Sequence, residues 1–469
     1  MQINTLSSFR IEKDLLGEMK IPQSAYYGIQ TQRAIENFNL SANSLQDYPD
    51  IIKALALVKG ACAAANNKQE LLTNKITNAI LYAVNEIVSG KFNTSFPVGM
   101  IQGGAGTSSN MNVNEVLANI ALESLGHNKG EYQHLHPNSD VNMSQSTNDV
   151  YPTAIKLSVL LKQDELIQEL SLLVNAFRGK SHEFKDVIKL ARTQLQDAVP
   201  MTLGQEFNGF ASTLHEDIKL ISSMGNLFTE INLGGTAVGT GINTKKGYSE
   251  LAIQELNSLT KMKFTMADDL IEASSDMGAF VIYSASLKRL GLKLSKIAND
   301  LRLLSMGPRA GLSEISLPAR QPGSSIMPGK INPVIPEAVS QCAYKVAGND
   351  VAISMAAEAG QLQLNAMEPL IAFSIHESID LLINAMAMFR KFCVEGVVAN
   401  KERCKFLLDN SLGLVTALNP HLGYEESTKI AKEALASGRS VIELVKSKNL
   451  LSDEELTKIL SPENMTQPS

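Results

Sequence analysis

The chain has 469 residues, of which 44% are apolar, so it is long enough for about three domains with substantial cores. Its net charge is −6 and no Lys/Arg run is present, which excludes a polyanion-binding groove and a basic membrane-binding surface. No segment approaches the roughly 18 apolar residues of a membrane span, and the N-terminus lacks the apolar core of a signal peptide. We therefore expect a cytoplasmic protein that binds neither nucleic acid nor membrane.

Residues 1–142 are expected to form an N-terminal helical domain. Aromatic residues make up 5% of the chain and Trp is absent, a balance that favours packed helices over β-sandwiches. Between residues 50 and 140, helical patterns alternate with polar turns. One such pattern runs from Ile76 to Val88 and stops at Gly90, a residue typical of helix C-termini.

Residues 143–397 are expected to form a central domain, a bundle of long helices. Apolar residues recur every three or four positions from Leu287 to Leu304, and similar patterns cover residues 165–177 and 370–389. A single chain offers few helices of this length to cover such a stripe. We therefore hypothesise that the bundle is shared between subunits.

The helical patterns shorten after Asn400, and residues 398–469 are expected to form a small C-terminal helical domain. One short helix should end near Gly438. Another should begin after Ser452, whose hydroxyl and the Glu455 carboxylate have the spacing of a capping box.

Three polar segments combine hydroxyls and amides with few charges. The first, residues 103–112, is a glycine-rich turn before a helix, and its free N–H groups suit a carboxylate. It matches neither a P-loop nor a dinucleotide-binding fingerprint. The second, Ser144–Asp149, opens a helical run and has more hydroxyls than one helix cap needs. The third, Arg192–Asp197, is also consistent with a structural Arg–Asp pair at a helix bend.

The fourth polar segment is the sequence GSSIMPGKINP at residues 323–333, called here the serine loop. Six prolines between Pro308 and Pro336 argue against a long helix there. Gly323 and Gly329 bracket the hydroxyls of Ser324 and Ser325 and are candidate hinges of a lid. Such a segment between helices is often only a connection, but here it carries hydroxyls, a lysine and an amide together.

Neither the histidines nor the cysteines show metal-binding spacing. The seven His residues include no H-x-x-x-H or H-E-x-x-H pattern, so we predict no metal site. The four Cys residues lack C-x-x-C spacing and lie in helix-like surroundings. They are expected to be packed, reduced thiols.

The four polar segments together closely resemble the aspartase/fumarase superfamily, whose signature is the loop G-S-S-x-M-P-x-K-x-N. The resemblance extends over almost the whole chain and includes residues 14–18, 26–31, 103–115, 137–149, 231–241, 296–309 and 360–369. It implies a mainly α, three-domain fold in which a central bundle of long helices is shared in a homotetramer, with active sites where subunits meet.

Within the superfamily, the chain most resembles the aspartase branch, which eliminates ammonia from L-aspartate to give fumarate. In the second segment, fumarases resemble the sequence Gln-Ser-Ser-Asn-Asp, whereas this chain has Thr147 in place of the second Ser. In the third segment, fumarases carry His after the Thr, whereas this chain has Gln194. Gln194 also departs from those aspartases that carry His there. Because an amide does not titrate, Gln194 is expected to bind the substrate ammonium through its carbonyl oxygen.

By analogy with the family, Ser324 is expected to be the general base that removes the C3 proton of the substrate. Its alkoxide form requires backbone N–H groups that donate to its oxygen and a loop that excludes water. Proton removal gives a doubly charged aci-carboxylate. Thr107, Ser146 and Thr147 are expected to bind this β-carboxylate, where negative charge develops.

The remaining candidates would hold the other end of the substrate. Lys330, with Thr193 and Asn332, is expected to bind the α-carboxylate, and Ser325 is a further substrate-binding candidate. Asn148 and Gln194 would orient the amino group. No organic cofactor is expected because elimination moves no hydride, although a divalent cation such as Mg²⁺ could activate the reaction.

Two alternatives differ from this interpretation. A fumarase-type hydratase, or another fumarate-releasing lyase of the superfamily, would differ in its leaving group, and Thr147 and Gln194 disfavour it. A catalytically silent relative with a structural or binding role would be expected to have lost Ser324, Lys330 or Asn332. All three are present.

Overall fold

The structure is a computed structural model that describes residues 8–466. It divides into two compact units. Unit 1 comprises residues 8–166, 220–288 and 345–380, and unit 2 comprises residues 167–219, 289–344 and 381–466. Both units are mainly helical, which confirms the predicted fold class. The predicted boundaries at residues 142/143 and 397/398 differ from these units, and the three-domain division stays a prediction.

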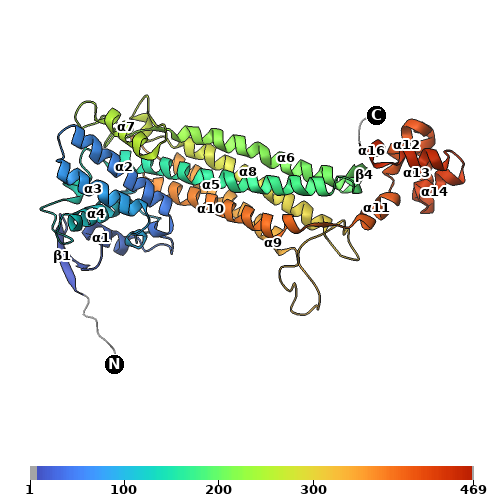
Figure 1. Ribbon diagram of the computed structural model, residues 1–469, viewed down its shortest axis with the longest axis horizontal. Helices are drawn as coiled ribbons and strands as arrows, with labels where there is room; N and C mark the ends of the chain where they lie inside the picture. The colour runs from blue at the N-terminus through green and yellow to red at the C-terminus, as the bar shows by residue number, and fades with distance from the viewer. Residues whose placement is uncertain (1–7, 467–469) are drawn as a thin grey trace. The chain divides into compact units, whose positions relative to one another are not determined.

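Unit 1 contains a group of helices from the N-terminal third of the chain. These are α1 (Ile29–Asn37), α2 (Pro49–Lys68), α3 (Asn74–Val88) and α4 (Thr107–Ser124), joined by α7 (Tyr248–Thr260). Helix α2 packs against α3 and α7, and α3 packs against α4 (Figure 1). The predicted helix ending before Gly90 is confirmed as α3, and its residues Ile80, Val84 and Ile87 are buried.

The strands of unit 1 are few and short. Strands β1 (Phe9–Asp14) and β2 (Gly17–Pro22) form an antiparallel hairpin, and β5 (Glu230–Ile231) pairs in parallel with β6 (Thr265–Met266). A π-helical turn, η3 (Pro137–Val141), precedes the second polar segment.

Unit 2 contains the short C-terminal helices and two strand pairs. The helices are α11 (Lys401–Asp409), α12 (Leu414–Leu422), α13 (Tyr424–Ser437), α14 (Val441–Ser447), α15 (Asp453–Ile459) and α16 (Pro462–Thr466). The strand pairs are β3 (Ile188–Thr193) with β4 (Gln196–Thr202) and β7 (Ile315–Ser316) with β8 (Val398–Ala399), both antiparallel. Helix α13 ends before Gly438, and Ser452 caps α15 in a capping box with Glu455, as predicted.

Five long helices contribute segments to both units. They are α5 (Thr147–Glu183), α6 (Leu203–Gly225), α8 (Gly278–Leu304), α9 (Val334–Glu358) and α10 (Glu368–Phe392). Within unit 2, Phe177 of α5 packs edge-to-face on Phe389 of α10, with ring centroids 6.0 Å apart. Within unit 1, Ser158 of α5 lies 2.7 Å from His376 of α10. All five lie inside the range predicted for long helices.

The apolar stripe from Leu287 to Leu304 corrects one argument for self-association. Its members, Leu287, Leu290, Leu294, Ile297, Leu301 and Leu304, are at most 5% exposed in the single chain. Because α8 buries this stripe within the protein itself, the stripe needs no partner subunit to cover it. The stripe was therefore the wrong reason for expecting a bundle that is shared between subunits.

One helical stretch, Glu368–Gly396, is long and apolar enough to span a membrane by length and composition. Its most apolar window is 61% buried inside the protein, as a core helix would be. All four cysteines are free thiols, as predicted, and Cys62, Cys393 and Cys404 are buried.

Candidate active site

Two threonine hydroxyls meet where helices α4 and α5 begin. Thr107 is the first residue of α4 and Thr147 the first of α5, and their Oγ1 atoms lie 3.3 Å apart. Thr107 Oγ1 also lies 2.8 Å from the carbonyl oxygen of Gly104. The N-terminus of a helix offers unpaired N–H groups and a positive dipole end, so this junction favours a bound anion.

The glycine-rich turn before α4 is shaped by Gly106. Its φ is +87°, and a Cβ there would lie 2.5 Å from the buried ring of Tyr151. Gln102 fixes the turn from the other side, because its amide bonds both the hydroxyl and the backbone N–H of Ser109, at 2.9 and 3.1 Å. The position of Thr107 therefore depends on a turn that only glycine can form.

The second polar segment, Ser144–Asp149, together with the two residues before it, is called here the polar corner (residues 142–149). The Ser146 hydroxyl accepts the N–H of Asn148 at 3.3 Å, and the Asp149 carboxylate accepts the N–H of Ser146 at 2.9 Å. This reciprocal pattern caps α5, so Ser146 has a structural role as well as a candidate catalytic one. The Asn148 side-chain amide donates to the carbonyl of Ala237 at 2.7 Å, which fixes its orientation.

Asp149 ties the polar corner to the glycine-rich segment around residue 235. Its Oδ2 accepts N–H groups from Gly234 at 2.8 Å and from Thr236 at 3.3 Å. The carboxyl is fully buried, and burial raises its pKa, whereas the three backbone N–H groups act in the opposite direction. These bonds fix the Asp149 carboxyl close to Ser146 and Thr147 in the chain. None of them uses the hydroxyl of either residue.

Lys59 is a buried charged residue of the site region that sequence reasoning missed. Its side chain is fully buried in α2, and the ammonium donates to Asn142 Oδ1 at 2.7 Å and to Gln145 Oε1 at 2.9 Å. Asn114 donates to the same Asn142 oxygen at 3.1 Å. Burial lowers the pKa of Lys59 to about 7. A single lysine within the apolar run of residues 54–65 was the available signal.

In unit 2, the serine loop places Ser324 as an acceptor of backbone hydrogen bonds. Its Oγ accepts the N–H of Ile326 at 3.2 Å and that of Met327 at 3.0 Å. These are donors of the kind that an alkoxide would need. Ser324 itself is half-buried, whereas Ser325 and Ile326 are exposed.

Hydrogen bonds across its base close the serine loop into a ring. Gly323 N–H donates to the carbonyl of Lys330 at 2.7 Å, and the Asn332 side-chain amide donates to the carbonyl of Gly323 at 2.6 Å. A Cβ on Gly323 would lie 2.5 Å from the Lys330 oxygen, and Gly329 has a φ of +81°. The structure therefore gives Asn332 a contact that holds the loop, in addition to its predicted role in binding the α-carboxylate.

A cleft of about 680 Å³ lies beside the serine loop within unit 2. Lys330 and Asn332 line it, together with Arg302 and Glu337, whose side chains are 3.8 Å apart. The exposed ammonium of Lys330 is thus next to a space that can admit a small carboxylate.

The third polar segment forms a β-hairpin, which corrects the expected helix bend. Thr193 pairs with Gln196, and the two residues between them, Gln194 and Leu195, have φ of +55° and +61°. Two consecutive positive φ values are typical of a type I′ turn. Thr193 and Gln194 are both exposed at this turn.

The expected Arg192–Asp197 pair is replaced by an ion pair with Glu314, a residue that the sequence did not single out. Arg192 Nη1 lies 2.9 Å from Glu314 Oε1, and Lys189 Nζ lies 3.0 Å from Glu314 Oε2. Glu314 is fully buried and directly precedes β7. It therefore anchors strand β3, which carries the Thr193 turn, to the segment that leads into the serine loop.

The predicted site residues fall into two sets. Thr107, Ser146, Thr147 and Asn148 lie in unit 1, around the starts of α4 and α5. Ser324, Ser325, Lys330 and Asn332 lie on the serine loop in unit 2, which also contains Thr193 and Gln194 on the β3–β4 turn. Hydrogen bonds to backbone groups order the side chains of Thr107, Ser146 and Asn148 in the first set and of Ser324 and Asn332 in the second.

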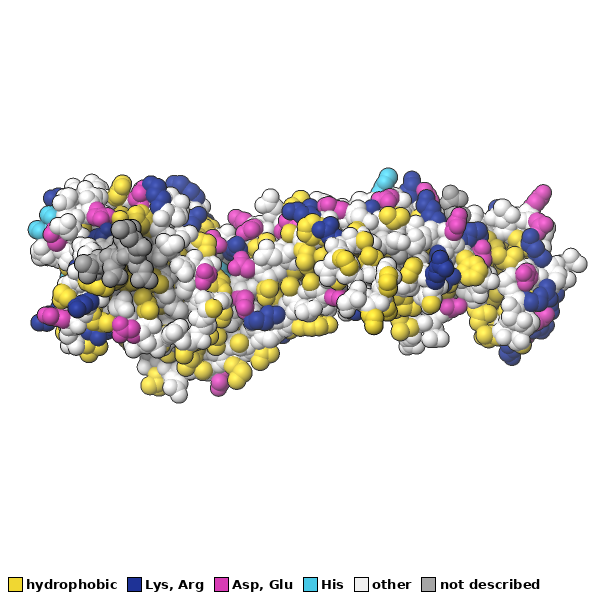
Figure 2. Space-filling model, turned by 90° about the horizontal axis from the view of Figure 1, so that it is seen from below, with side chains coloured by type: hydrophobic (Ala, Val, Ile, Leu, Met, Phe, Trp, Pro, Cys, Tyr) yellow, Lys and Arg dark blue, Asp and Glu magenta, His cyan; other side chains and the backbone are white. Residues whose placement is uncertain are grey.

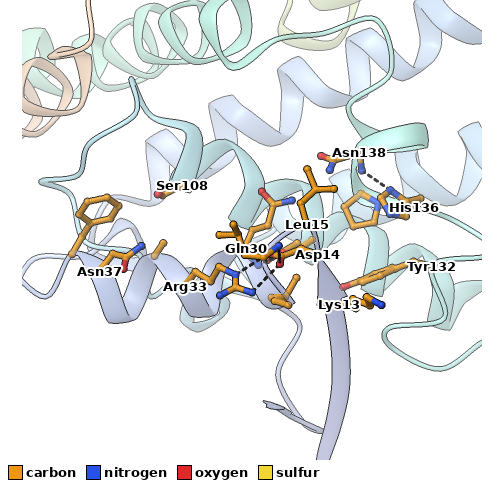
Figure 3. Close-up of a pocket in the computed structure, with 16 residues that line it drawn as sticks. Lys13, Asp14, Leu15, Gln30, Arg33, Asn37, Ser108, Tyr132, His136 and Asn138 are labelled. Carbon is orange, nitrogen blue, oxygen red and sulfur yellow. Dashed lines mark hydrogen bonds and ion pairs between the residues drawn. The ribbon is translucent and has the colours of Figure 1, made fainter. Parts of the chain in front are cut away.

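A separate pocket of about 710 Å³ in unit 1 contains none of the predicted site residues. It is lined by residues of β1, α1 and η3, among them Asp14, Arg33 and His136 (Figure 3). Arg33 binds Asp14 through two hydrogen bonds of 2.7 and 2.8 Å, and His136 Nδ1 accepts the N–H of Asn138 at 3.0 Å. Arg33 and Asp14 therefore neutralise each other within the pocket.

Family models match most of the sequence. A model described as a lyase matches residues 17–348, and a model described as the fumarase C C-terminus matches residues 414–467. The first range includes every predicted site residue, and the second includes the short helices α12 to α16.

Curated relatives match over nearly their full length. An aspartate ammonia-lyase of Pseudomonas canavaninivorans is 59% identical over 467 residues, covering 99% of this chain and 98% of the relative. One from Escherichia coli strain K12 is 50% identical over 464 residues, covering 99% and 97%.

Solved structures show the same fold. A fumarate lyase:delta crystallin of Brucella melitensis, bound to cobalt, has a TM-score of 0.96 and 54% identity, covering 98% of this chain and 100% of that chain. A class II fumarase of Schistosoma mansoni has a TM-score of 0.92 and 37% identity with the same coverage. The identity to this fumarase is thus lower than that to the two ammonia-lyases above.

Proposed function

Because the chain belongs to the aspartase/fumarase superfamily of lyases, we propose that Ser324 is the general base of its elimination reaction. The chain is a carbon–nitrogen lyase of the aspartate ammonia-lyase type, which converts L-aspartate to fumarate and ammonia. The observation that carries this activity is 59% identity to an aspartate ammonia-lyase over 467 residues.

The chemical difficulty lies in the C3 proton of aspartate, which is weakly acidic beside a carboxylate that is already charged. Removing it places a second negative charge on the β-carboxylate as an aci-carboxylate. We assign that carboxylate to Thr107, Ser146 and Thr147, whose hydroxyls lie where α4 and α5 begin. Preorganised donors and two helix N-termini stabilise such charge without reorganisation during the reaction.

The proton acceptor in this proposal is the alkoxide form of the Ser324 side chain. A serine hydroxyl ordinarily titrates far above neutral pH, so its deprotonated form must be stabilised by the site. The N–H groups of Ile326 and Met327, 3.2 and 3.0 Å from Ser324 Oγ, support the assignment because they favour negative charge on that oxygen. Closure of the exposed serine loop over the substrate would exclude water and strengthen both bonds.

Lys330 is proposed to bind the α-carboxylate, helped by Thr193, Ser325 and Asn332. Its ammonium is exposed beside the 680 Å³ cleft, as expected of a charge that meets a substrate. Asn148 and Gln194 are proposed to orient the amino group so that it departs anti to the C3 proton. Because the Gln194 amide does not titrate, it would bind the ammonium without exchanging protons.

We propose that the reaction needs no organic cofactor, because elimination moves no hydride. A divalent cation such as Mg²⁺ is proposed as an activator and not as a participant in the chemical step.

The protein is further proposed to be a cytoplasmic homotetramer with active sites where subunits meet. Large apolar side chains on α8 and α9 support self-association, because Ile282, Val351 and Met355 are 50%, 58% and 68% exposed. Apolar side chains lie among charged ones on the face seen in Figure 2. Exposed apolar surface of this kind is common at subunit interfaces.

An assay of substrate choice tests the proposed function. Purified protein is incubated with L-aspartate, L-malate, argininosuccinate or adenylosuccinate, and fumarate is followed by its ultraviolet absorbance. We expect fumarate from L-aspartate. Fumarate from L-malate but not from L-aspartate would support the fumarase alternative, and no product from any substrate would support a silent relative.

A further inference from the structure

Three potential metal ligands converge in the loop that follows helix α4. The ligand atoms of His127, Glu131 and His134 all lie within 4.8 Å of one another. His127 Nδ1 is 3.5 Å from Glu131 Oε2, and the two imidazole rings are stacked, with centroids 3.9 Å apart and planes inclined by 10°. The H-x3-E-x2-H spacing differs from the patterns searched in the sequence, so the prediction of no metal site did not consider it.

The backbone of this loop is ordered by its own hydrogen bonds. Gly126 and Gly130 have φ of +85° and +84°, which turn the chain twice within five residues. His127 N–H donates to the carbonyl of Leu122 at 3.0 Å, and His134 N–H donates to that of Glu131 at 3.0 Å. The side chain of Asn119 in α4 accepts the N–H of Gly130 at 2.8 Å. The three ligand side chains therefore extend from a defined framework.

Asn128 holds the Glu131 carboxylate in position. Its backbone N–H donates to Glu131 Oε2 at 3.2 Å and its side-chain amide donates to Oε1 at 2.9 Å. The side-chain and backbone bonds from Asn128 lower the pKa of Glu131. A carboxylate oxygen has two lone pairs, so each oxygen keeps one for a further partner. Such outer hydrogen bonds typically orient metal ligands.

The local charges favour a cation at this position. The carbonyl groups at the end of α4 present the negative pole of the helix, and His127 is bonded to one of them. The nearest cationic side chain of the loop, Lys129, is paired with Glu123 at 3.2 Å and lies 4.2 Å over the Tyr26 ring. Its charge is therefore largely offset within the loop.

We propose that His127, Glu131 and His134 form a surface site for a divalent transition-metal ion such as Zn²⁺, Co²⁺ or Ni²⁺. Imidazole nitrogens with one carboxylate select these ions over Mg²⁺ and Ca²⁺, which prefer all-oxygen ligands. Metal–ligand bonds of about 2.0–2.2 Å place tetrahedral donors roughly 3.3–3.6 Å apart. The separation of His127 and Glu131 already has this value, and the exposed ring of His134 can rotate to bring its nitrogen into range.

A simpler interpretation of the same three residues is an ordinary surface pair between protonated His127 and Glu131. A two-residue pair does not account for the third ligand, because the ring of His134 stacks on that of His127 and its ligand atom lies within 4.8 Å of the other two. A metal would bind unprotonated imidazole nitrogens, whereas the ion pair requires a protonated one. The two interpretations differ in whether a metal binds at neutral pH.

The test is a titration of the full-length, tag-free and chelator-treated protein with CoCl₂, followed by calorimetry and by the visible absorption of protein-bound Co²⁺. We expect saturable binding that Mg²⁺ does not compete away. His127→Asn, His134→Asn and Glu131→Gln should each weaken it at least tenfold. Asn128→Ala, which removes only the outer hydrogen bond, should weaken it roughly tenfold.

His182→Asn serves as the matched control, because it removes an exposed imidazole from α5 and should leave Co²⁺ binding unchanged. Circular dichroism checks that each variant is folded. The proposal is overturned if the wild-type protein shows no saturable Co²⁺ binding, or if the double variant His127→Asn/His134→Asn binds Co²⁺ as tightly as the wild type. Because the readout is metal binding, it is independent of the elimination reaction.

Discussion

The serine loop and the polar corner differ in burial. In the serine loop, the candidate catalytic side chains are exposed or half-buried, whereas the polar corner contains the fully buried carboxyl of Asp149 and is bonded to the fully buried ammonium of Lys59. Ser324 and Lys330 are held by bonds within residues 323–332. Ser146 is held by Asp149, which also binds the segment around residue 235, and the adjacent Gln145 is bonded to Lys59 of α2. Substitutions in the first region should therefore affect turnover alone, and substitutions in the second should affect turnover and stability together.

The largest expected effect on stability comes from Gly106→Ala, at the turn that positions Thr107. The positive φ costs a non-glycine residue about 1–2 kcal/mol. The new methyl group would also overlap the buried Tyr151 ring, and overpacking costs about 1–3 kcal/mol more. We expect a loss of roughly 2–5 kcal/mol in the free energy of unfolding, measured by urea denaturation, together with a lower kcat/KM.

Gly179→Ala is the control for this substitution. Gly179 lies inside α5, and a Cβ there would have no atom within 4 Å, so alanine should leave stability unchanged or raise it slightly. Equal stability of the Gly106→Ala variant and the wild type would contradict the tight contact between the turn and Tyr151.

A smaller and separable effect is expected from Lys330→Met in the serine loop. Loss of a charge-assisted hydrogen bond to the α-carboxylate costs about 1.5–3 kcal/mol, which corresponds to roughly a 10- to 150-fold lower kcat/KM. Because the ammonium is exposed, the urea midpoint should stay at the wild-type value. A variant with a shifted midpoint and normal kcat/KM would show that Lys330 is structural and would break the contrast between the two regions.

The effect that is smallest, when counted per pH unit, concerns the pH dependence of stability, which Lys59 should influence. Its pKa in the folded protein is about 7, below the ordinary 10.5, so between these values the unfolded chain binds more protons than the folded one. The free energy of unfolding should therefore rise with pH from about 7 towards 10, by at most about 1.4 kcal/mol per pH unit from this group.

Lys59→Met removes the titrating group and should flatten this rise. Urea midpoints at pH 6.5, 8 and 9.5 measure the difference between variant and wild type. An equal slope in both proteins would mean that hydrogen bonds to Asn142 and Gln145 keep the ammonium charged over the whole range. The same variant should have a lower kcat, since the polar corner loses a buried donor.

The sequence predicted the features that are local along the chain. The capping box at Ser452, the helix end before Gly90 and the proline-rich serine loop each depend on a few neighbouring residues, and all agree with the structure. The apolar stripe of α8 was predicted correctly as a helix face. What covers this face was not predicted correctly, because periodicity identifies a buried face but not the partner that buries it.

The features that were missed depend on residues distant in sequence. The β3–β4 turn lacks Asn-Gly or Asp-Gly, and only the paired strands reveal it. The ion pairs of Glu314 join residues more than 120 positions apart, and the hydrogen bonds of Lys59 join residues more than 80 apart. No motif marks such partners. The one sequence signal of these long-range contacts was a charged residue within an apolar helix, and it applied to Lys59 alone.

The central claim is that Ser324 removes the C3 proton, and kcat for L-aspartate in Ser324→Ala tests it most directly. Loss of a general base lowers the rate by about 10²–10⁴-fold. We predict a decrease of this size with an unchanged circular dichroism spectrum, while Ser325→Ala, which removes the adjacent hydroxyl, mainly raises KM. A Ser324→Ala variant that retains the wild-type kcat would contradict the account.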